Sequence, residues 1–222
     1  METGKANNIK TSNFNIDLVE QYHLSVQIGI KHFSYCIINT KTRTVEYFNN
    51  YVIDNDITTI INTDDIIKTN FSSSSIAFVN FPSTLVPASI YTEDSAKEIL
   101  ELNTETSDIV KADSINKIDA HIIYTLPTNI NDIVNTYFPK AKQKAQQSIL
   151  LEQFSKLDNS NKSAYLFIND NIVNITVFNN GELIFNNAFD FVTKEDLLYF
   201  TLFAFEQLKI DTESVEVKVY GS

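Results

Sequence analysis

The sequence predicts an α/β protein that contains the same unit twice: three antiparallel strands, a helix and a further strand. The second copy covers residues 163–222, and the first begins near residue 24. When Ile28 is matched to Ile168, the first two strands of both copies coincide in position and in apolar spacing. The order and spacing of five elements, kept together in both copies, indicate an internal repeat more strongly than any single residue match.

Matching the later elements of the two copies requires changes of offset. The second turn of the first copy is expected to be three residues longer than that of the second copy. A small further change of length is expected before the last strand. The matched pairs are then Phe48 with Phe185, Asp56 with Thr193, and Ile76 with Val215.

The second copy is the clearer one, because polar turns separate its apolar segments. Its strands are expected at 164–168, 172–178, 182–189 and 214–220. The turn after the first strand consists of Asn169, Asp170 and Asn171. Alternating apolar segments between such turns are typical of an antiparallel meander.

The helix expected over 194–209 carries apolar residues on nearly every side. Thr193 and Asp196 have the spacing of a capping box at its start. Its apolar residues are Leu197, Leu198, Phe200, Leu202, Phe203, Phe205 and Leu208. A helix that is apolar all round is buried all round. We therefore expect it to lie between its own sheet and either the other copy or a partner protein.

The first copy shows the same pattern with more polar strands. Its strands are expected at 24–28, 33–39, 44–52 and 76–81, with a tight turn over 29–32. Asp56 is the expected N-cap of a helix that reaches about Lys68. Cys36 lies between apolar neighbours in the second strand, and we expect it in the core.

Between the two copies the pattern indicates shorter elements. Two prolines keep 82–87 from being a central strand. Strands are expected at 109–112 and 120–126. One helix is expected over 93–102, capped by Thr92 or Ser95. Another is expected to begin at Asn129 or Asn131 and to end before Pro139. For 140–146, alternation predicts an edge strand before a helix that starts at Ser148, whereas propensity predicts one helix over 140–157. The residues alone leave both readings open.

Composition and charge restrict the classes of partner. A chain of 222 residues with 43% hydrophobic residues can bury two small cores. Its net charge of −11 opposes binding to a phosphate backbone, so no nucleic-acid partner is expected. No apolar segment approaches the roughly 20 residues of a membrane span, and the N-terminus lacks the layout of a signal peptide. With Cys36 as the single cysteine, we expect a cytoplasmic protein.

Three segments carry a resemblance to a known family. They are Leu24-Ser-Val-Gln-Ile28, Phe81-Pro-Ser-Thr-Leu-Val-Pro87, and the run from Asn187-Ala-Phe-Asp-Phe to Phe203-Ala-Phe-Glu-Gln-Leu208. From about residue 20 onward the chain resembles an uncharacterised bacterial family, a domain of unknown function assigned an actin-like ATPase fold. The resemblance implies two ribonuclease-H-like halves, each a mixed sheet that opens with a three-strand meander and is flanked by helices. It also favours the strand for 140–146.

The resemblance implies a division of the chain. We expect a mobile N-terminal tail over 1–19, which Phe14 and Ile16 dock onto the rest of the protein, a first half over 20–160, and a second half over 161–222. The second half lacks the last elements of a full copy, so we expect it to be incomplete at its C-terminus.

An actin-like fold binds ATP between its halves, where the two first-hairpin turns cradle the phosphates. The candidates that the resemblance implies are Gly29, Lys31, Ser34, Asn169, Asp170, Asn171 and Gly221. Asp170 would serve the metal through water, and Gly221 would admit the adenosine. However, the second turn has no glycine, and the chain has only four. A phosphate cradle needs close backbone approach and positive φ, which glycine adopts at least cost.

We therefore expect a non-catalytic interaction or assembly module with a degenerate nucleotide cleft, and a protein partner of unknown identity. Its binding surface would be the surplus apolar surface of the last helix and of the loop over 85–87. We expect no catalytic residue and no metal site, because His23, His32 and His121 lack metal-ligand spacing. The alternative is an ATP-binding protein or weak ATPase that uses ATP with Mg in the cleft between the halves.

Overall fold

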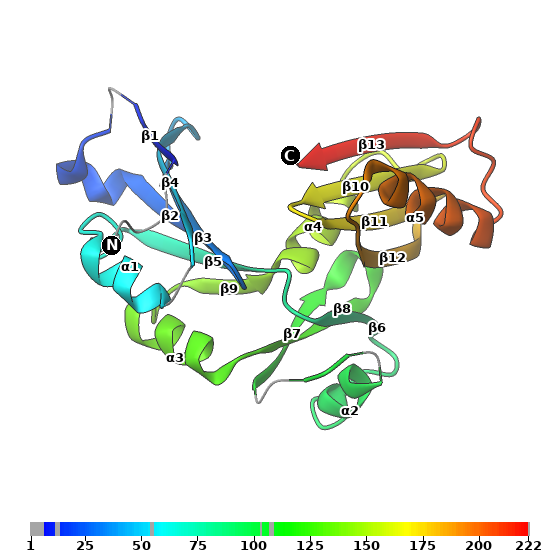
Figure 1. Ribbon diagram of the computed structural model, residues 1–222, viewed down its shortest axis with the longest axis horizontal. Helices are drawn as coiled ribbons and strands as arrows, with labels where there is room; N and C mark the ends of the chain where they lie inside the picture. Colours follow the sequence, from blue (N-terminus) through cyan, green and yellow to red (C-terminus); the bar gives the residue numbers. More distant parts are fainter. Residues whose placement is uncertain (1–6, 12–13, 54–55, 103, 107–108, 222) are drawn as a thin grey trace. The chain divides into compact units, whose positions relative to one another are not determined.

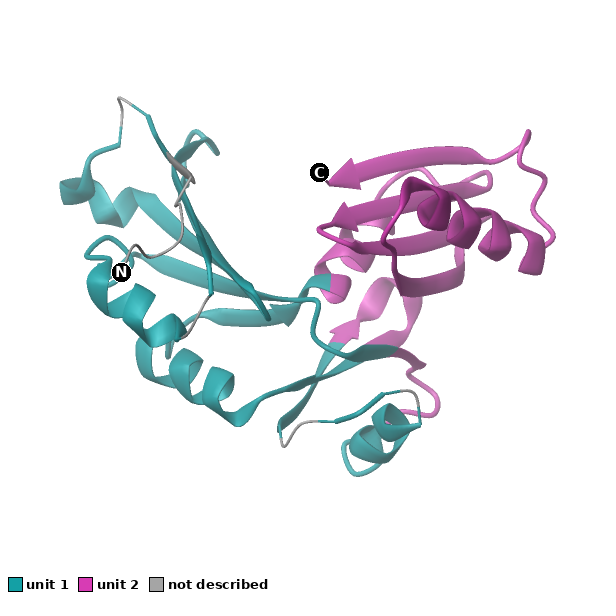
Figure 2. Cartoon of the chain, viewed as in Figure 1, with its two compact units in different colours: residues 1–84, 92–113, 123–146 teal, residues 85–91, 114–122, 147–222 magenta. Residues whose placement is uncertain are grey.

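The computed structural model describes residues 7–11, 14–53, 56–102, 104–106 and 109–221. The chain splits into two compact units, coloured separately in Figure 2. Unit 1 comprises residues 1–84, 92–113 and 123–146, and unit 2 comprises residues 85–91, 114–122 and 147–222. Every helix among the described residues is too short or too polar to span a lipid bilayer.

Unit 1 is organised around a six-stranded sheet with the order β1-β4-β3-β2-β5-β9 (Figure 1). The strands are β1 (Asn7–Lys10), β2 (Tyr22–Gly29), β3 (His32–Asn39), β4 (Val45–Val52), β5 (Ser73–Val79) and β9 (Lys142–Ala145). The first three of the predicted unit, β2, β3 and β4, form the antiparallel meander. Strand β5 runs parallel to β2, and β9 runs parallel to β5. The mixed sheet and the strand over 140–146 are therefore confirmed.

Part of the segment that we expected to be a tail is structured. Strand β1 pairs antiparallel with β4 and forms one edge of the sheet. Phe14 is buried, with its ring centroid 5.6 Å from Tyr22 and 5.3 Å from Tyr47, so the expected docking of this residue is confirmed. A 3-10 helix over Ile16–Gln21 leads into β2. The tail residues 1–6 and 12–13 lie outside the described residues.

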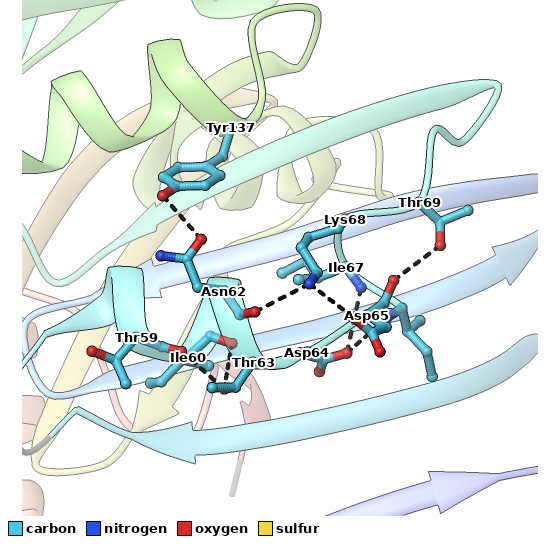
Figure 3. Close-up of polar contacts among 11 residues, drawn as sticks. Thr59, Ile60, Asn62, Thr63, Asp64, Asp65, Ile67, Lys68, Thr69 and Tyr137 are labelled. Atoms are coloured by element: carbon cyan, nitrogen blue, oxygen red, sulfur yellow. Dashed lines mark hydrogen bonds and ion pairs between the residues drawn. The ribbon is translucent and has the colours of Figure 1, made fainter.

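The two faces of the first sheet differ in polarity. The helices α1 (Ile57–Thr63) and α3 (Thr128–Tyr137) lie along one face (Figure 1), joined by the Tyr137 hydroxyl, which donates to Asn62 Oδ1 at 3.2 Å (Figure 3). The buried side chains on this side include Val26, Ile28, Phe33 and Ile37 of the sheet, and Ile57, Ile61 and Val134 of the two helices. The alternate residues of the strands point to the other face, and among them is Cys36, which is only half-buried. Its placement in the core was wrong, because the strand alternation puts Tyr35 and Ile37 there instead.

Helix α1 begins as predicted but ends early. The Asp56 side chain accepts a hydrogen bond from the Thr58 N–H, which confirms the N-cap. The helix ends at Thr63 rather than near Lys68, because Asp64 has extended backbone angles and stops it. Asp64 Oδ1 accepts bonds from the N–H groups of Ile66 at 3.0 Å and Ile67 at 3.4 Å, which hold the turn after the helix (Figure 3).

The other oxygen of Asp64 anchors the meander. Asp64 Oδ2 accepts bonds from the hydroxyls of Tyr35 at 2.6 Å and Tyr51 at 2.7 Å. Burial and the nearby Asp64 raise the pKa of both phenols, so both stay protonated and donate. Asn49 is buried beside them, and its Nδ2 contacts the Tyr51 hydroxyl at 2.5 Å while its Oδ1 has no hydrogen-bond partner.

Unit 2 contains a four-stranded sheet with the order β12-β11-β10-β13. The strands are β10 (Ser163–Asn169), β11 (Ile172–Asn179), β12 (Glu182–Asp190) and β13 (Glu216–Gly221). One face packs against α5 (Lys194–Gln207), through a core that includes Ala164, Leu166, Val173, Ile175, Ala204 and Phe205. The other face packs against α4 (Gln146–Phe154), where the Phe154 ring stacks on Tyr165 at 4.6 Å. Both faces of this sheet are covered.

The two meanders share the register of their first hairpin. Ile28 pairs with Phe33 in unit 1, and Ile168 pairs with Val173 in unit 2, which is the match expected from the sequence. The next hairpin of each unit contains a bulge at the matching place, after Ile37 in β3 and after Val177 in β11. Strand β13 runs parallel to β10, as β5 runs parallel to β2. The repeat of a meander, a helix and a parallel strand is therefore confirmed.

The expected match of the third strands was wrong by one residue. Phe48 pairs with Cys36, whose counterpart Thr176 pairs with Asn186 rather than with Phe185. The second turns of the two meanders differ by two residues and not by three. The segment Phe-Asn-Asn occurs in both copies, at 48–50 and 185–187, and matching these identical residues gave a register that is wrong by one.

The expected match of the fourth strands was also wrong. Ile76 pairs with Val26, and the counterpart Leu166 pairs with Val219, so Ile76 corresponds to Val219 and not to Val215. The error of four residues is even, and a strand pattern with a period of two fits equally well after any even shift.

The remaining elements lie between the two meanders in the sequence. They are β6 (Ser83–Pro87), α2 (Ala96–Glu101), β7 (Ile109–Ile115), a 3-10 helix (Asn116–Ile118) and β8 (Ala120–Leu126). The three strands form a sheet with the order β6-β8-β7. Strand β6 lies at its edge, as the two prolines predicted. Helix α2 uses the later of its two expected starts, Ser95, and α3 begins at Thr128, one residue before Asn129.

Candidate functional site

The first-hairpin turn of unit 1 carries the candidates Gly29, Lys31 and Ser34. Gly29 ends β2, and Ile30 and Lys31 form the exposed turn before β3. Ser34 lies on β3, where its hydroxyl donates to Gln27 Oε1 at 3.5 Å. These three residues therefore lie on one hairpin, at the carboxyl end of β2, the edge at which open α/β sheets bind ligands.

The conformation of this turn does not require glycine. A Cβ atom at Gly29 would lie 3.4 Å from the His32 carbonyl oxygen and 3.5 Å from that of Val79. These are ordinary contacts, and the φ of Gly29 is not positive. Ile30 and Lys31 do not have positive φ either. The turn thus lacks the left-handed residues that typically aim successive N–H groups at a phosphate.

The corresponding turn of unit 2 carries Asn169, Asp170 and Asn171. Asn169 pairs with Ile172, so the turn itself is Asp170 and Asn171. Asp170 has a φ of 54°, a conformation that glycine adopts at less cost. The Asn171 carbonyl accepts a bond from the Phe191 N–H at 2.8 Å, which ties the turn to the end of β12.

Gly221 lies beside this turn, and packing explains why this position is a glycine. It pairs with Ile168 across the parallel strands β10 and β13 and has a φ of 98°. A Cβ atom here would lie 1.8 Å from the Ile168 carbonyl oxygen, so no larger residue fits without a backbone shift. Asn169 and Gly221 thus end neighbouring strands, and the structure brings the unit 2 candidates together at one edge of their sheet.

A cluster of titratable side chains in unit 1 escaped the sequence reasoning. Lys111 on β7 donates from Nζ to Gln143 Oε1 on β9 at 2.6 Å, and Nζ lies 5.7 Å from the centre of the Phe78 ring. Burial lowers the pKa of Lys111, and the charge of Asp113 partly offsets this.

Asp113 links the same two strands. Its Oδ2 accepts a bond from the Ala145 N–H at 2.8 Å. Burial, with the nearby Asp113 carboxylate, raises the pKa of Tyr124. Lys111 and Asp113 are two residues apart on β7, so their side chains lie on the same face of the strand. The sequence did not predict this pairing, because the expected strand ended at Ala112. The cluster is bonded within itself, so it ties β7 to β9 rather than presenting groups to a ligand.

The outward side of α5 carries large apolar side chains that are exposed. The α5 patch consists of Leu198, Tyr199, Leu202 and Phe203, which are 59%, 61%, 44% and 41% exposed. The rings of Tyr199 and Phe203 stack on the surface, with centroids 5.9 Å apart. The expectation that this helix is buried on every side was wrong, because only the side that carries Thr201, Ala204 and Phe205 is buried against the sheet.

Both ends of α5 are firmly terminated, which holds the patch in place. At the start, the predicted capping box is confirmed: Thr193 Oγ1 accepts from the Asp196 N–H at 3.1 Å, and Asp196 Oδ2 accepts from the Thr193 N–H at 2.9 Å. Bonds from the N–H groups of Thr193 and Val192 to its carboxylate lower the pKa of Asp196. At the end, Lys209 has a φ of 52°, and the Ile210 N–H donates to the Phe205 carbonyl at 2.8 Å, which together form a Schellman motif.

The fold is shared with solved structures. One is a Bacteroides thetaiotaomicron protein with an actin-like ATPase fold and unknown function; it has a TM-score of 0.85 and 22% identity, over 94% of this chain and 85% of that one. Another is cyto-EpsL, the cytoplasmic domain of an inner membrane component of the type II secretion system of Vibrio cholerae. It has a TM-score of 0.54 and 9% identity, over 90% of this chain and 82% of that one. The predicted actin-like fold is therefore confirmed.

The sequence comparisons identify a family and name no activity. No curated protein matches the chain significantly. The model of one family matches residues 11–222, almost the whole chain. The chain therefore belongs to the family described as "Protein of unknown function (DUF3822)" and has the actin-like ATPase fold.

Proposed function

We propose that this protein is a non-catalytic interaction or assembly module on an actin-like scaffold. The observation that carries the proposal is the α5 patch. Four large apolar side chains on two turns of one helix face outward, although the inner face of the same helix already fills the core of unit 2. Contiguous exposed apolar surface of this kind marks sites where proteins bind one another.

The two turns support a non-catalytic role. The turn at Gly29 has no residue with positive φ, and the turn at Asp170 has one residue in that conformation, which is not glycine. Backbone N–H groups in such turns are poorly placed to cradle phosphates. Gly221, the candidate for adenosine, is required by its contact with Ile168.

The likeness to cyto-EpsL is consistent with the proposal. That protein is a domain of a component of a secretion system, so an actin-like fold can serve within a multi-component apparatus. We further propose that the module acts in the cytoplasm, since the single cysteine, Cys36, fits a reducing compartment. Fractionation of cells that produce a tagged full chain would test the location.

The competing function is ATP binding with weak hydrolysis, which the charged residues Lys31 and Asp170 at the two turns favour. A thermal-shift titration of the full chain with Mg-ATP separates the two. A ligand at 100 times its Kd stabilises a protein by about 2.7 kcal/mol, which raises the Tm of a chain of this size by roughly 5–10 °C. We expect no shift at millimolar Mg-ATP. A rise of several degrees that is lost in the Asp170→Asn variant would overturn the proposal in favour of the alternative.

A further inference from the structure

We propose that the α5 patch binds an amphipathic helix of a partner protein that carries lysine or arginine at both ends of its apolar stripe. This inference rests on the proposed function and specifies the chemistry of the partner.

The geometry of the patch favours a helix as the bound element. Leu198 and Leu202 are four residues apart, as are Tyr199 and Phe203, so the exposed side of α5 carries two parallel ridges. A groove between two such ridges accepts one ridge of another helix, which is the commonest packing of helices in globular proteins. The stacked rings of Tyr199 and Phe203 make one wall of the groove stiff.

A carboxylate stands at each end of the groove. Glu195 precedes Tyr199 by four residues and Glu206 follows Leu202 by four, so both lie on the same side of α5 as the patch, and both are exposed. At 1.5 Å per residue, their positions are about 16 Å apart along the helix axis. Lys194 is the first residue of α5, and Lys209 follows the C-cap residue Leu208. Over residues 190–222 the chain carries seven acidic side chains and three lysines, so the segment that contains α5 is acidic.

These charges argue against a second copy of this chain as the occupant. In a symmetric dimer the same patch covers itself. An antiparallel pair of α5 helices would bring Glu195 of one copy close to Glu206 of the other. A parallel pair would bring each glutamate close to the same glutamate of the second copy. The net charge of −11 adds a general repulsion. A helix with basic ends relieves the repulsion and pairs with both carboxylates.

The test is a selection from a displayed library of 18-residue helical peptides. The library has leucine fixed along one face and Lys, Gln or Glu varied at the two ends, and it is selected against the full chain. We expect Lys to be recovered at the ends about tenfold more often than Glu, the ratio for two surface ion pairs gained and two like-charge contacts avoided. A double variant, Glu195→Lys with Glu206→Lys, should reverse the preference. Binding of a selected peptide, measured by fluorescence anisotropy, should weaken with added salt.

Two controls keep the result interpretable. The double variant Leu202→Asp with Phe203→Asp should lose peptide recovery while keeping its circular dichroism spectrum, because both side chains are exposed. Leu102→Asp, at an exposed leucine in unit 1, should leave recovery unchanged. Recovery without a charge preference, or recovery that survives the loss of Leu202 and Phe203, would overturn the proposed partner chemistry. A dimer in light scattering that dissociates in the Leu202→Asp and Phe203→Asp variant would also overturn it, in favour of a second copy. None of these results would restore nucleotide binding, which the Mg-ATP titration decides separately.

Discussion

Helices α1 and α5 occupy the same place in two related units, yet their outward sides differ. Each follows the third strand of a meander and leads to the strand parallel to the first. Both bury apolar residues on the inward side, Ile57, Ile60 and Ile61 in α1 and Ala204 and Phe205 in α5. The outward side of α1 consists of Thr59, Asn62 and Thr63, whereas that of α5 is the α5 patch. The topology requires only the inward apolar side, so the outward one needs another reason.

The second faces of the two sheets differ in the opposite sense. In unit 2 this face is covered by α4, and Ser163 on it is 2% exposed. In unit 1 the counterpart of Ser163 is His23, by the shared hairpin register. His23 is half-buried and contacts Ser73 and Ser75 through its two ring nitrogens, at 2.8 Å each. The same strand order thus allows this face to be either a buried core, where a helix such as α4 covers it, or a set of hydrogen-bonded polar side chains.

The largest expected effect separates the two sides of α5. Phe205→Ala should lower the free energy of unfolding by about 3–5 kcal/mol, because a buried ring leaves a cavity. Phe203→Ala, two residues away on the exposed side, should change it by less than about 0.5 kcal/mol. Urea denaturation of both variants measures the difference. Equal losses would show that the α5 patch is packed in solution, and the contrast with α1 would disappear.

The next effect concerns the end of α1. Asp64→Ala should destabilise the protein by about 2–3 kcal/mol, because the hydroxyls of Tyr35 and Tyr51 lose their shared acceptor. The neighbouring Asp65 is exposed and forms an ion pair with Lys68 at 2.7 Å, so Asp65→Ala is the matched control and should have no measurable effect. Denaturation of the two variants under the same conditions distinguishes a buried anchor from a surface charge. Similar midpoints would mean that Asp64 does not anchor the meander.

The smallest effect tests the polar face of unit 1 by its pH dependence. Burial and the charge of Lys142 lower the pKa of His23 below its ordinary value of 6.5. The folded state therefore binds the proton less readily than the unfolded state does. The stability from neutral His23 is present above pH 6.5 and declines as the pH falls through the unfolded and then the folded pKa. Between pH 7.5 and pH 5.5 the wild type should lose more stability than His23→Gln. Parallel curves for the two proteins would contradict this account.

Much of the fold could be predicted because its determinants are local. The first-hairpin register follows from apolar alternation around Ile28 and Ile168, and the start of α5 follows from the spacing of Thr193 and Asp196. The placement of candidates at the ends of β2 and β10 followed from the resemblance to the actin-like family. Whether those residues bind ATP stays a prediction.

Two features were missed because distant residues decide them. Asp64 ends α1 through contacts with Tyr35 and Tyr51 in other strands, which helical spacing cannot reveal. Lys111 and Asp113 form a cluster with Gln143 and Ala145, about thirty positions away in the sequence.

By itself, the sequence determined that the chain repeats a meander, a helix and a strand, because turns, caps and apolar alternation act over a few residues. Only the tertiary structure decided that β13 pairs with β10 at Val219 rather than at Val215, since a period of two fits every even shift. It also decided which side of α5 stays exposed, since a helix that is apolar all round gives no local signal of its inward side. That exposed side is the part of the molecule from which a function can be inferred.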